Sequence, residues 1–367
     1  MGKFNHKKRD RKARPENKER KDNNGGWRDN KNGSEDPIIE RQNSLFEKFY
    51  EVCSKCDSFE KAQRIVSIEE WSSFMHHLRQ DLPQSFRFVG CRRYPDGLGF
   101  QLNLPRRVLR KHVLLNNLHN FLVTESELGH LSRQESVSMI PPLLMDINST
   151  SRIFDMCAAP GSKTAQLIEM LHGDDENGVP SGFVLANDEN NKRCYLLVHQ
   201  SLKRLNSPCC LVDNDTIESM RFDQILCDAP CSGDGTLRKN FAIWKTWSPY
   251  HGYNLHRQTR IAKRGLEMLH VGGSMVYSTC SLNPAENEAT IAYLLSFSQG
   301  SVELVDCSDK LPGLKRSYGL HTWKIMDKEG NFYESLEEVS EEKKRYFPDT
   351  IFPPSLDDAK RMRLERW

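Results

Sequence analysis

From Arg152 onward, short apolar runs alternate with segments of helical spacing, and this alternation limits how the chain can fold more than any other feature. The strand-like runs are RIFDM, FVLAND, PCCLVD, DQILCDAP, GGSMVYSTC and VELVD. The helical segments between them are KTAQLIEML, NKRCYLLVHQSLKRL, HRQTRIAKRGLEML and PAENEATIAYLLSF. Strands separated by helices build parallel sheets with helices on both faces. The pattern therefore predicts a doubly wound α/β fold.

Acids and thiols follow the ends of these strand-like runs. They are Asp155, Cys157, Asp188, Asp213, Asp215, Asp228, Cys231 and Cys280. Open parallel sheets bind ligands beyond the carboxyl ends of their strands, where the loops converge. A random scatter of buried cysteines and surface acids would not follow strand ends in this way. We therefore expect a functional site at this edge of the sheet.

Four regions are expected along the 367 residues: a basic tail (1–36), an N-terminal region (37–140), the sheet domain (141–307) and a C-terminal extension (308–367). Apolar spacing predicts helices between residue 37 and about residue 80. Ser132 and Glu135 form a capping-box signature, which predicts another helix start.

The tail carries the excess of positive charge. Residues 1–36 hold twelve Lys or Arg and seven Asp or Glu, whereas the whole chain has a net charge of only +2. A segment so polar predicts disorder. Its KKRDRKAR core fits a nuclear import signal or a non-specific RNA tether, and a solvated tail without a role fits the composition equally well.

A second basic cluster lies between Arg87 and Lys111. Its other cations are Arg92, Arg93, Arg106, Arg107 and Arg110, and Phe86, Phe88, Tyr94 and Phe100 are interleaved with them. Cations for phosphates beside rings for unpaired bases suit a single-stranded RNA surface. An ordinary exposed strand and helix would give the same composition.

The sequence contains no segment that predicts export or membrane insertion, because it has no apolar signal core and no run of eighteen apolar residues. Its eleven cysteines are therefore expected to be reduced thiols. Cys53 and Cys56 form a lone CxxC without a partner pair, and we expect no metal.

The first strand-like run leads into a turn of small residues, Cys157-Ala158-Ala159-Pro160-Gly161-Ser162-Lys163. Small side chains let a ligand approach the backbone, and a helix start favours a carboxylate or phosphate. The turn matches neither a Walker A loop nor GxGxxG. Asp188 is placed to accept hydrogen bonds from ribose hydroxyls. A nucleoside that carries an amino-acid carboxylate fits both features, which points to S-adenosylmethionine.

Five segments carry a resemblance to a known family: RQESVSMIPPLL, DMCAAPGSKTAQLIEML, ANDENNKRCYLLVHQ, CDAPCSGDGT and VYSTCSLNPAENE. They resemble the Sun/Nop family of RNA cytosine-5 methyltransferases, and within it the eukaryotic tRNA methyltransferase branch. The resemblance implies a Rossmann-like class I methyltransferase sheet with S-adenosylmethionine on Cys157 to Lys163. It also places Asp188 at the ribose, Asp215 near the adenine and Asp228 toward the methionine amino group and the target base.

Cytosine-5 methylation needs a thiolate that adds to carbon 6 and so makes carbon 5 nucleophilic. Spacing alone leaves Cys231 and Cys280 as equal candidates for this thiolate. The resemblance assigns the nucleophile to Cys280 and product release to Cys231, with Asp228 orienting the base and Lys163 as an electrostatic helper. Asn283-Pro284-Ala285-Glu286 predicts a helix start just after Cys280.

The expected partner is RNA, above all tRNA, and the expected protein is a monomer in the nucleus and nucleolus with a cytoplasmic fraction. A DNA cytosine methyltransferase is disfavoured by the TC motif around Cys280. A second hypothesis is a catalytically impaired RNA-binding or scaffold form of the same family. It arises because the chain ends at Trp367, where the family usually continues into a further strand.

Overall fold

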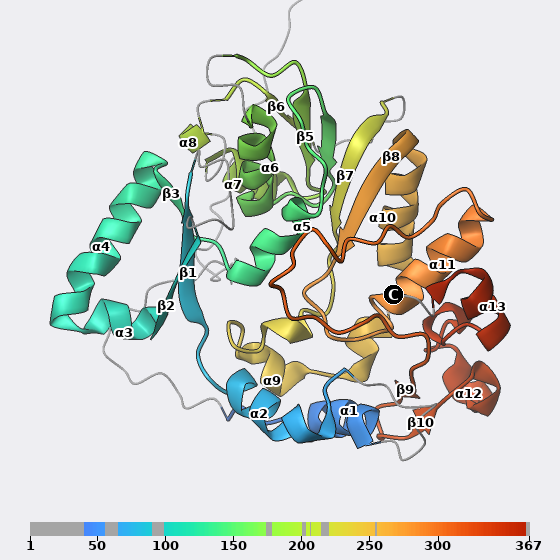
Figure 1. Cartoon of the computed structure of the whole chain (residues 1–367). Coiled ribbons are helices and arrows are strands. Elements are labelled where there is room, and N and C mark those ends of the chain that lie inside the picture. Colours follow the sequence, from blue (N-terminus) through green and yellow to red (C-terminus); the bar gives the residue numbers. More distant parts are fainter. Residues whose placement is uncertain are drawn as a thin grey trace, which may run out of the picture. The chain divides into compact units, whose positions relative to one another are not determined.

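Five parallel strands form the central sheet of the computed structural model, in the order β6-β5-β4-β7-β8 (Figure 1). Their bounds are β4 Arg152–Asp155, β5 Phe183–Asn187, β6 Cys210–Asp213, β7 Phe222–Asp228 and β8 Leu269–Ser278. The structure describes residues 40–55, 65–89, 99–173, 178–199, 203–205, 207–213, 220–253 and 255–364. Five of the six predicted strands therefore form, and the predicted doubly wound fold is confirmed.

Successive residues of the central strands pack on opposite faces of this sheet. Helix α6 (Ser162–His172) covers one face, where its Leu167 contacts the cluster that contains Ile153 of β4. Helices α10 (Leu255–Glu267) and α11 (Glu288–Ser298) pack on the other face, against the cluster around Phe154. Side chains alternate between the faces of a strand, so a run that is apolar at every position marks a strand buried on both sides.

The sixth predicted strand, VELVD at residues 302–306, does not form within the part of the chain that the structure describes. Side-chain burial does alternate along this segment: Val302 and Leu304 pack against α11 and α13 (Leu356–Arg361), while Val305 is exposed. The segment lacks a described strand partner, and alternating burial alone does not make a ladder.

The N-terminal region holds an antiparallel sheet of order β2-β1-β3, which the sequence analysis missed. The region contains α1 Ser44–Lys55, α2 Ile68–Leu78, β1 Pro83–Phe88, β2 Gly99–Pro105, α3 Arg106–Lys111, α4 Val113–Leu128 and β3 Leu131–Ser132. The usual polarity of a half-buried strand is inverted in β1, where Ser85 and Arg87 are buried and Phe88 is exposed. This inversion is why hydrophobic periodicity did not reveal the sheet.

The helix start predicted at Ser132 is wrong. Ser132 pairs with β1 as part of β3, and a 3₁₀ turn at Ser136–Met139 leads into α5 (Ile140–Leu143). Gln134, which the capping box would have placed in a helix, instead accepts a hydrogen bond from Arg87 Nε at 3.0 Å and receives one from Ser85 Oγ at its carbonyl, at 2.7 Å. Tertiary hydrogen bonds therefore outweigh the local signal.

The remaining elements connect strands of the central sheet or follow the sheet in the chain. They are α7 Asn191–Leu197, α8 Lys203–Leu205, α9 Ala242–Thr246, β9 Ile325–Met326, β10 Phe332–Tyr333 and α12 Glu341–Lys344. Trp323, Phe347 and Ile351 from the C-terminal segment pack against Ala285 and Ala289, which follow Cys280 in the chain. No described helix has the length and apolar character that a membrane crossing requires. Residues 39–367 form one unit by their contacts, so the boundaries expected at residues 140 and 307 stay predictions.

A fully buried carboxylate, that of Asp234, joins the N-terminal region to the loops beyond β7 and β8. Oδ2 accepts hydrogen bonds from Tyr50 Oη at 2.6 Å and Trp247 Nε1 at 3.1 Å. Oδ1 accepts from Ser281 Oγ at 3.0 Å and from the backbone N–H of Leu282 at 2.7 Å. A buried carboxylate is stable only when it is hydrogen-bonded in this way.

Replacing Asp234 by Ala leaves these donors buried without an acceptor. We expect the free energy of unfolding to fall by at least about 3 kcal/mol. Urea-induced unfolding followed by tryptophan fluorescence measures the loss. The matched control Asp309→Ala, at an exposed acid, should change it by less than about 0.5 kcal/mol. Equal unfolding midpoints for the two variants would contradict this role for Asp234.

Candidate active site

The small-residue turn after β4 forms a buried cradle at the start of α6. Ala158 and Ala159 are 6% exposed, and the N–H of Ala158 donates to the carbonyl of Asn187 at 2.8 Å. Gly161 precedes the helix with a φ of 105°, a conformation that side chains with a Cβ disfavour. The turn therefore brings its backbone close to the end of β5.

Asp188 lies directly after β5 and is 2% exposed. One carboxylate oxygen accepts from the N–H of Asn190 at 3.1 Å, and the other lies 3.2 Å from Arg193 Nη1. Arg193 Nη2 also donates to the carbonyl of Ala159 at 2.6 Å. Arg193 therefore links the two halves of the expected cofactor site, and no sequence signal had identified it.

Asp155 ends β4 beneath this turn. Its Oδ2 accepts from Thr164 Oγ1 at 2.7 Å, whereas Oδ1 is buried without a hydrogen-bond partner among the described residues. Burial raises the pKa of the Asp155 carboxyl to about 7. A buried acid with an unused oxygen, a backbone cradle and Asp188 fit a nucleoside that carries an amino and a carboxylate group.

Asp228 ends β7 and is held from two sides. Lys163 Nζ donates to Oδ2 at 2.7 Å, and Ser278 Oγ donates to Oδ1 at 2.8 Å. Lys163 comes from the first turn of α6 and Ser278 ends β8, the strand beside β7. The carboxylate is thus fixed between the expected cofactor turn and the loop that carries Cys280.

The two candidate thiols meet because β7 and β8 are parallel neighbours in which Asp228 pairs with Ser278. Cys231 and Cys280 follow these residues, and their sulfur atoms lie 3.3 Å apart. The N–H of Cys280 also donates to Cys231 Sγ at 3.3 Å. The strand register therefore brings together two thiols that are far apart in the sequence.

The two thiols are inequivalent. The hydrogen bond from Cys231 lowers the pKa of Cys280, and the charge of Lys163 acts in the same direction. The same hydrogen bond, burial and the charge of nearby Glu286 raise the pKa of Cys231. Cys280 is exposed, whereas Cys231 is half-buried. Cys280 is therefore the sulfur that ionises first.

Glu286 holds the Cys231 loop in place, a role that sequence reasoning missed. Its Oε1 accepts from the N–H of Ser232 and from Gln258 Nε2, each at 2.8 Å, and its Oε2 accepts from Ser232 Oγ at 2.5 Å. Burial raises the pKa of this carboxyl. The helix start predicted at Asn283 is wrong, because α11 begins at Glu288. Glu286 lies before this helix, and its side chain accepts hydrogen bonds from the Cys231 loop.

Gly235 sets the approach of the two loops. Its N–H donates to the carbonyl of Cys280 at 2.9 Å, and a Cβ at this position would lie 2.8 Å from that oxygen. Real Cβ atoms do not approach a backbone oxygen so closely. The glycine of the GDG segment is therefore needed for packing against Cys280.

Two further cysteines at the strand ends, Cys157 and Cys227, are held in their protonated form by burial. Burial raises the pKa of Cys157 to about 12 and that of Cys227 well above its usual range. In the part of the chain that is described, no group of three or more His, Cys, Asp and Glu side chains could hold a metal ion.

Four cations of the predicted RNA surface lie on α3. Arg106, Arg107, Arg110 and Lys111 are all exposed there. The prediction that Arg87 belongs to this basic surface is wrong, because its side chain is 3% exposed and forms an ion pair with Glu169. Arg92, Arg93 and Asp215 lie outside the described residues, as does the tail of residues 1–36.

Three aromatic rings gather on the outer face of the β1–β2 pair. Phe86 stacks with Phe100 at a centroid distance of 5.6 Å, and Phe88 meets Phe100 edge to face, also at 5.6 Å. Phe88 is 40% exposed and Phe100 is 43% exposed. Exposed rings of this kind offer stacking surfaces.

The parallel sheet, with its small-residue turn after β4 and a buried acid after β5, defines a Rossmann-like class I methyltransferase fold. A family model described as 16S rRNA methyltransferase RsmB/F matches residues 142–336. The chain belongs to this family, and the family resemblance stated from the motifs is confirmed.

Curated relatives carry the similarity further. The tRNA (cytosine(34)-C(5))-methyltransferase of Drosophila melanogaster is 41% identical in an alignment that covers 95% of this chain and 53% of the relative. The multisite-specific tRNA:(cytosine-C(5))-methyltransferase of Saccharomyces cerevisiae is 38% identical, covering 91% and 53%. The chain therefore spans about half the length of these relatives.

Among solved structures, the crystal structure of PH0851 matches with a TM-score of 0.50 at 18% identity. The match covers 70% of this chain and 60% of that chain. At this identity the likeness shows the fold alone.

The inequality of the thiols predicts the order of alkylation by iodoacetamide. Because its pKa is lowered, Cys280 should react at lower pH than Cys231, as read by peptide mass spectrometry across a pH series. Cys231→Ala removes the hydrogen-bond donor and should shift the Cys280 profile to higher pH. Cys307→Ala should leave that profile unchanged. Earlier reaction of Cys231, or an unmoved profile in Cys231→Ala, would contradict the assignment.

Proposed function

We propose that this chain transfers a methyl group from S-adenosylmethionine to carbon 5 of cytosine in tRNA. The observation that carries the proposal is the pair of sulfur atoms 3.3 Å apart, beside the Lys163–Asp228 ion pair. Covalent cytosine chemistry needs a thiolate to attack the ring and a group to help release the product. Two thiols of opposite pKa shift meet both needs in one site.

Cys280 is the proposed nucleophile. Its thiolate adds to carbon 6 of cytosine, which places electron density on carbon 5 and removes the aromatic stabilisation that makes this carbon unreactive. The lowered pKa of Cys280 increases the thiolate fraction near neutral pH. Its exposure allows a base that has left its stack to reach the sulfur.

Asp228 and Lys163 orient the base and stabilise charge. Both oxygens of Asp228 already accept hydrogen bonds, so the carboxylate is fixed in position before the base arrives. A fixed acceptor at the base edge favours the protonated ring nitrogen of the adduct, and Lys163 keeps the local potential suited to the thiolate.

Cys231 is the proposed release group. Its pKa is raised, so it stays protonated while the adjacent Cys280 sulfur is bonded to the ring. A base from the solvent then takes the carbon-5 proton, and the electron pair of that C–H bond re-forms the double bond between carbons 5 and 6. The bond between Cys280 Sγ and carbon 6 breaks, so the thiolate is restored. A protonated thiol within hydrogen-bonding distance stabilises that departing thiolate.

The proposed cofactor residues are Cys157, Ala158, Ala159, Pro160, Gly161, Ser162, Lys163, Asp188, Asp215 and Asp228. S-adenosylmethionine, when bound, supplies an electrophilic methyl group on a sulfonium. The backbone of the turn would hold its carboxylate, and Asp188 would accept from its ribose hydroxyls. Arg193 would have to keep or exchange its contact with Asp188 when the nucleoside enters.

tRNA is proposed as the substrate because the curated relatives are named as tRNA enzymes over the same region. The exposed rings Phe88 and Phe100 and the cations of α3 suit a single-stranded segment of such an RNA. The proposal also includes a monomer that needs no metal. A nuclear location rests on the composition of the tail alone, which lies outside the described residues.

The second hypothesis, a catalytically impaired scaffold form, gains no support. The two proposed thiols and the Lys163–Asp228 pair lie together within the described residues, and the relatives over this region are named as enzymes, which supports the first hypothesis.

Methyl transfer from labelled cofactor to unmodified tRNA transcripts tests the proposal. We expect label at 5-methylcytosine, mapped to individual cytosines by bisulfite sequencing. Cys280→Ala should lower the rate by more than about a thousandfold, because the raised pKa of the adjacent Cys231 keeps that thiol from replacing the nucleophile. Cys307→Ala should keep the rate. An unlabelled product with the unsubstituted chain, or full activity in Cys280→Ala, would contradict the proposal.

A further inference from the structure

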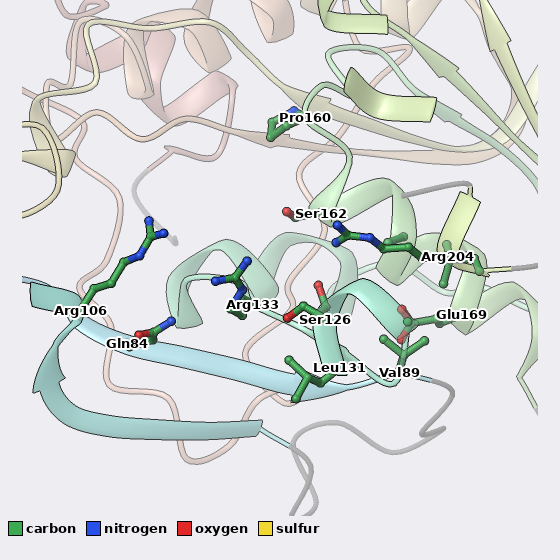
Figure 2. A pocket seen from close by; sticks show the side chains of 14 residues that line it. Gln84, Val89, Arg106, Ser126, Leu131, Arg133, Pro160, Ser162, Glu169 and Arg204 are labelled. Carbon is green, nitrogen blue, oxygen red and sulfur yellow. The ribbon is translucent and has the colours of Figure 1, made fainter. Parts of the chain in front are cut away.

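A cavity of about 350 Å³ lies beside α6, on the side of the N-terminal region (Figure 2). One wall is formed by residues from β1, α4, β3 and the start of α3, and the other by Pro160, Ser162 and Glu169 together with α8. None of Cys157, Asp188, Asp228 and Cys280 lines it. The cavity therefore lies apart from Asp188 and from the thiol pair, whereas Pro160 and Ser162 belong both to its lining and to the expected cofactor turn.

Three arginines from different parts of the chain line this cavity: Arg106, Arg133 and Arg204. Figure 2 shows the guanidinium group of Arg204 extending toward Ser162, with Arg133 nearby and Arg106 at the left of the view. None of the three forms an ion pair within 4.0 Å with a residue that the structure describes. The acid in the lining, Glu169, is bonded to the buried Arg87.

Burial and the mutual repulsion of these arginines lower the pKa values of Arg133 itself and of the nearby His119. Burial, and then the charges of Arg106 and Arg204, lower the pKa of Arg133, while the charge of Glu127 acts in the opposite direction and does not cancel them. Burial, followed by the charges of Arg106, Arg110 and Arg133, lowers the pKa of His119. Cations gathered at a partly buried site destabilise each other unless an anion neutralises them.

The start of α6 adds to the positive potential. The helix runs for eleven residues from Ser162, and no side chain caps its first N–H groups. The N–H groups of this turn are those proposed for the cofactor carboxylate, whereas the helix dipole adds positive potential on the side of the cavity as well. Guanidinium groups in turn bind phosphate oxygens in pairs, with a geometry that lysine does not reproduce.

We propose that this cavity binds a backbone phosphate of the RNA strand that delivers the target cytosine. The inference rests on the proposed function and adds a contact site to it. Ser162 lines the cavity and the next residue, Lys163, binds Asp228, so a phosphate here anchors the strand close to the reactive groups. It also joins the N-terminal region to the sheet domain, since both contribute arginines.

Binding of an unmodified tRNA transcript, measured by fluorescence anisotropy over a salt series, tests the proposal on the full chain. Arg133→Gln and Arg204→Gln should each weaken binding about tenfold, as expected for a lost charge-assisted phosphate contact. Each should also reduce the slope of log K against log salt by about 0.7 to 0.9. Calorimetry with S-adenosylhomocysteine should give an unchanged affinity for the cofactor product.

Two further variants separate a local contact from other effects. Arg316→Gln removes the same charge at an exposed position outside the cavity, and it should change neither the affinity nor the slope. Arg133→Lys keeps the charge but loses the paired geometry, so it should keep the slope and weaken binding less than Arg133→Gln. Thermal melting confirms that each variant is folded.

Each alternative outcome overturns the proposal. If Arg133→Gln lowers the affinity for S-adenosylhomocysteine and leaves the affinity for tRNA unchanged, the cavity holds the cofactor carboxylate instead. If all variants, including Arg316→Gln, weaken tRNA binding equally, the loss of affinity comes from the overall loss of positive charge and not from a contact in the cavity. If the unsubstituted chain neither binds nor methylates tRNA, the proposed function has failed. If it does both and the cavity variants match it, this inference alone has failed.

Discussion

The buried carboxylate of Asp234 is the interaction on which the arrangement of the reactive loops depends. It accepts hydrogen bonds from α1 through Tyr50, from Trp247, and from the Cys280 loop through Ser281 and Leu282. Glu286 acts in the same way one loop further on, where it holds Ser232. Both carboxylates are desolvated, so each fixes backbone positions by hydrogen bonds that water cannot replace. The thiols are therefore positioned by acids that do not themselves react.

This arrangement explains how one site can hold two thiols with different properties. The β7–β8 register brings Cys231 and Cys280 together, and the charged groups around them differ. Glu286 lies on the side of Cys231 and opposes its ionisation, whereas Lys163 lies on the side of Cys280 and favours it. A shared hydrogen bond amplifies the difference, because the proton stays on Cys231. The strands and the charges together assign the roles that spacing alone left open.

The sequence predicted the central sheet and the strand ends well, because strands buried on both faces read as unbroken apolar runs. It did not predict Arg193 or the Arg106–Arg133–Arg204 cavity, because these groups come from distant segments and meet only in the folded chain. The sequence predicts Arg87 as a surface cation, and this is wrong because the strand that carries it turns its aromatic residues outward and its arginine inward. The sequence has helix-capping motifs at Ser132 and Asn283, but no helix begins at either residue. Hydrogen bonds that Gln134 and Glu286 form with distant segments stabilise other local structures there.

The central claim is that Cys280 makes the bond to cytosine and Cys231 undoes it. Trapping of the covalent protein–RNA adduct tests this claim most directly, by denaturing gel electrophoresis after incubation with S-adenosylmethionine and tRNA. The account predicts that Cys231→Ala accumulates the adduct, because bond formation continues while release is slow, and that Cys280→Ala forms none. An adduct with Cys280→Ala and none with Cys231→Ala would reverse the assignment and contradict the account.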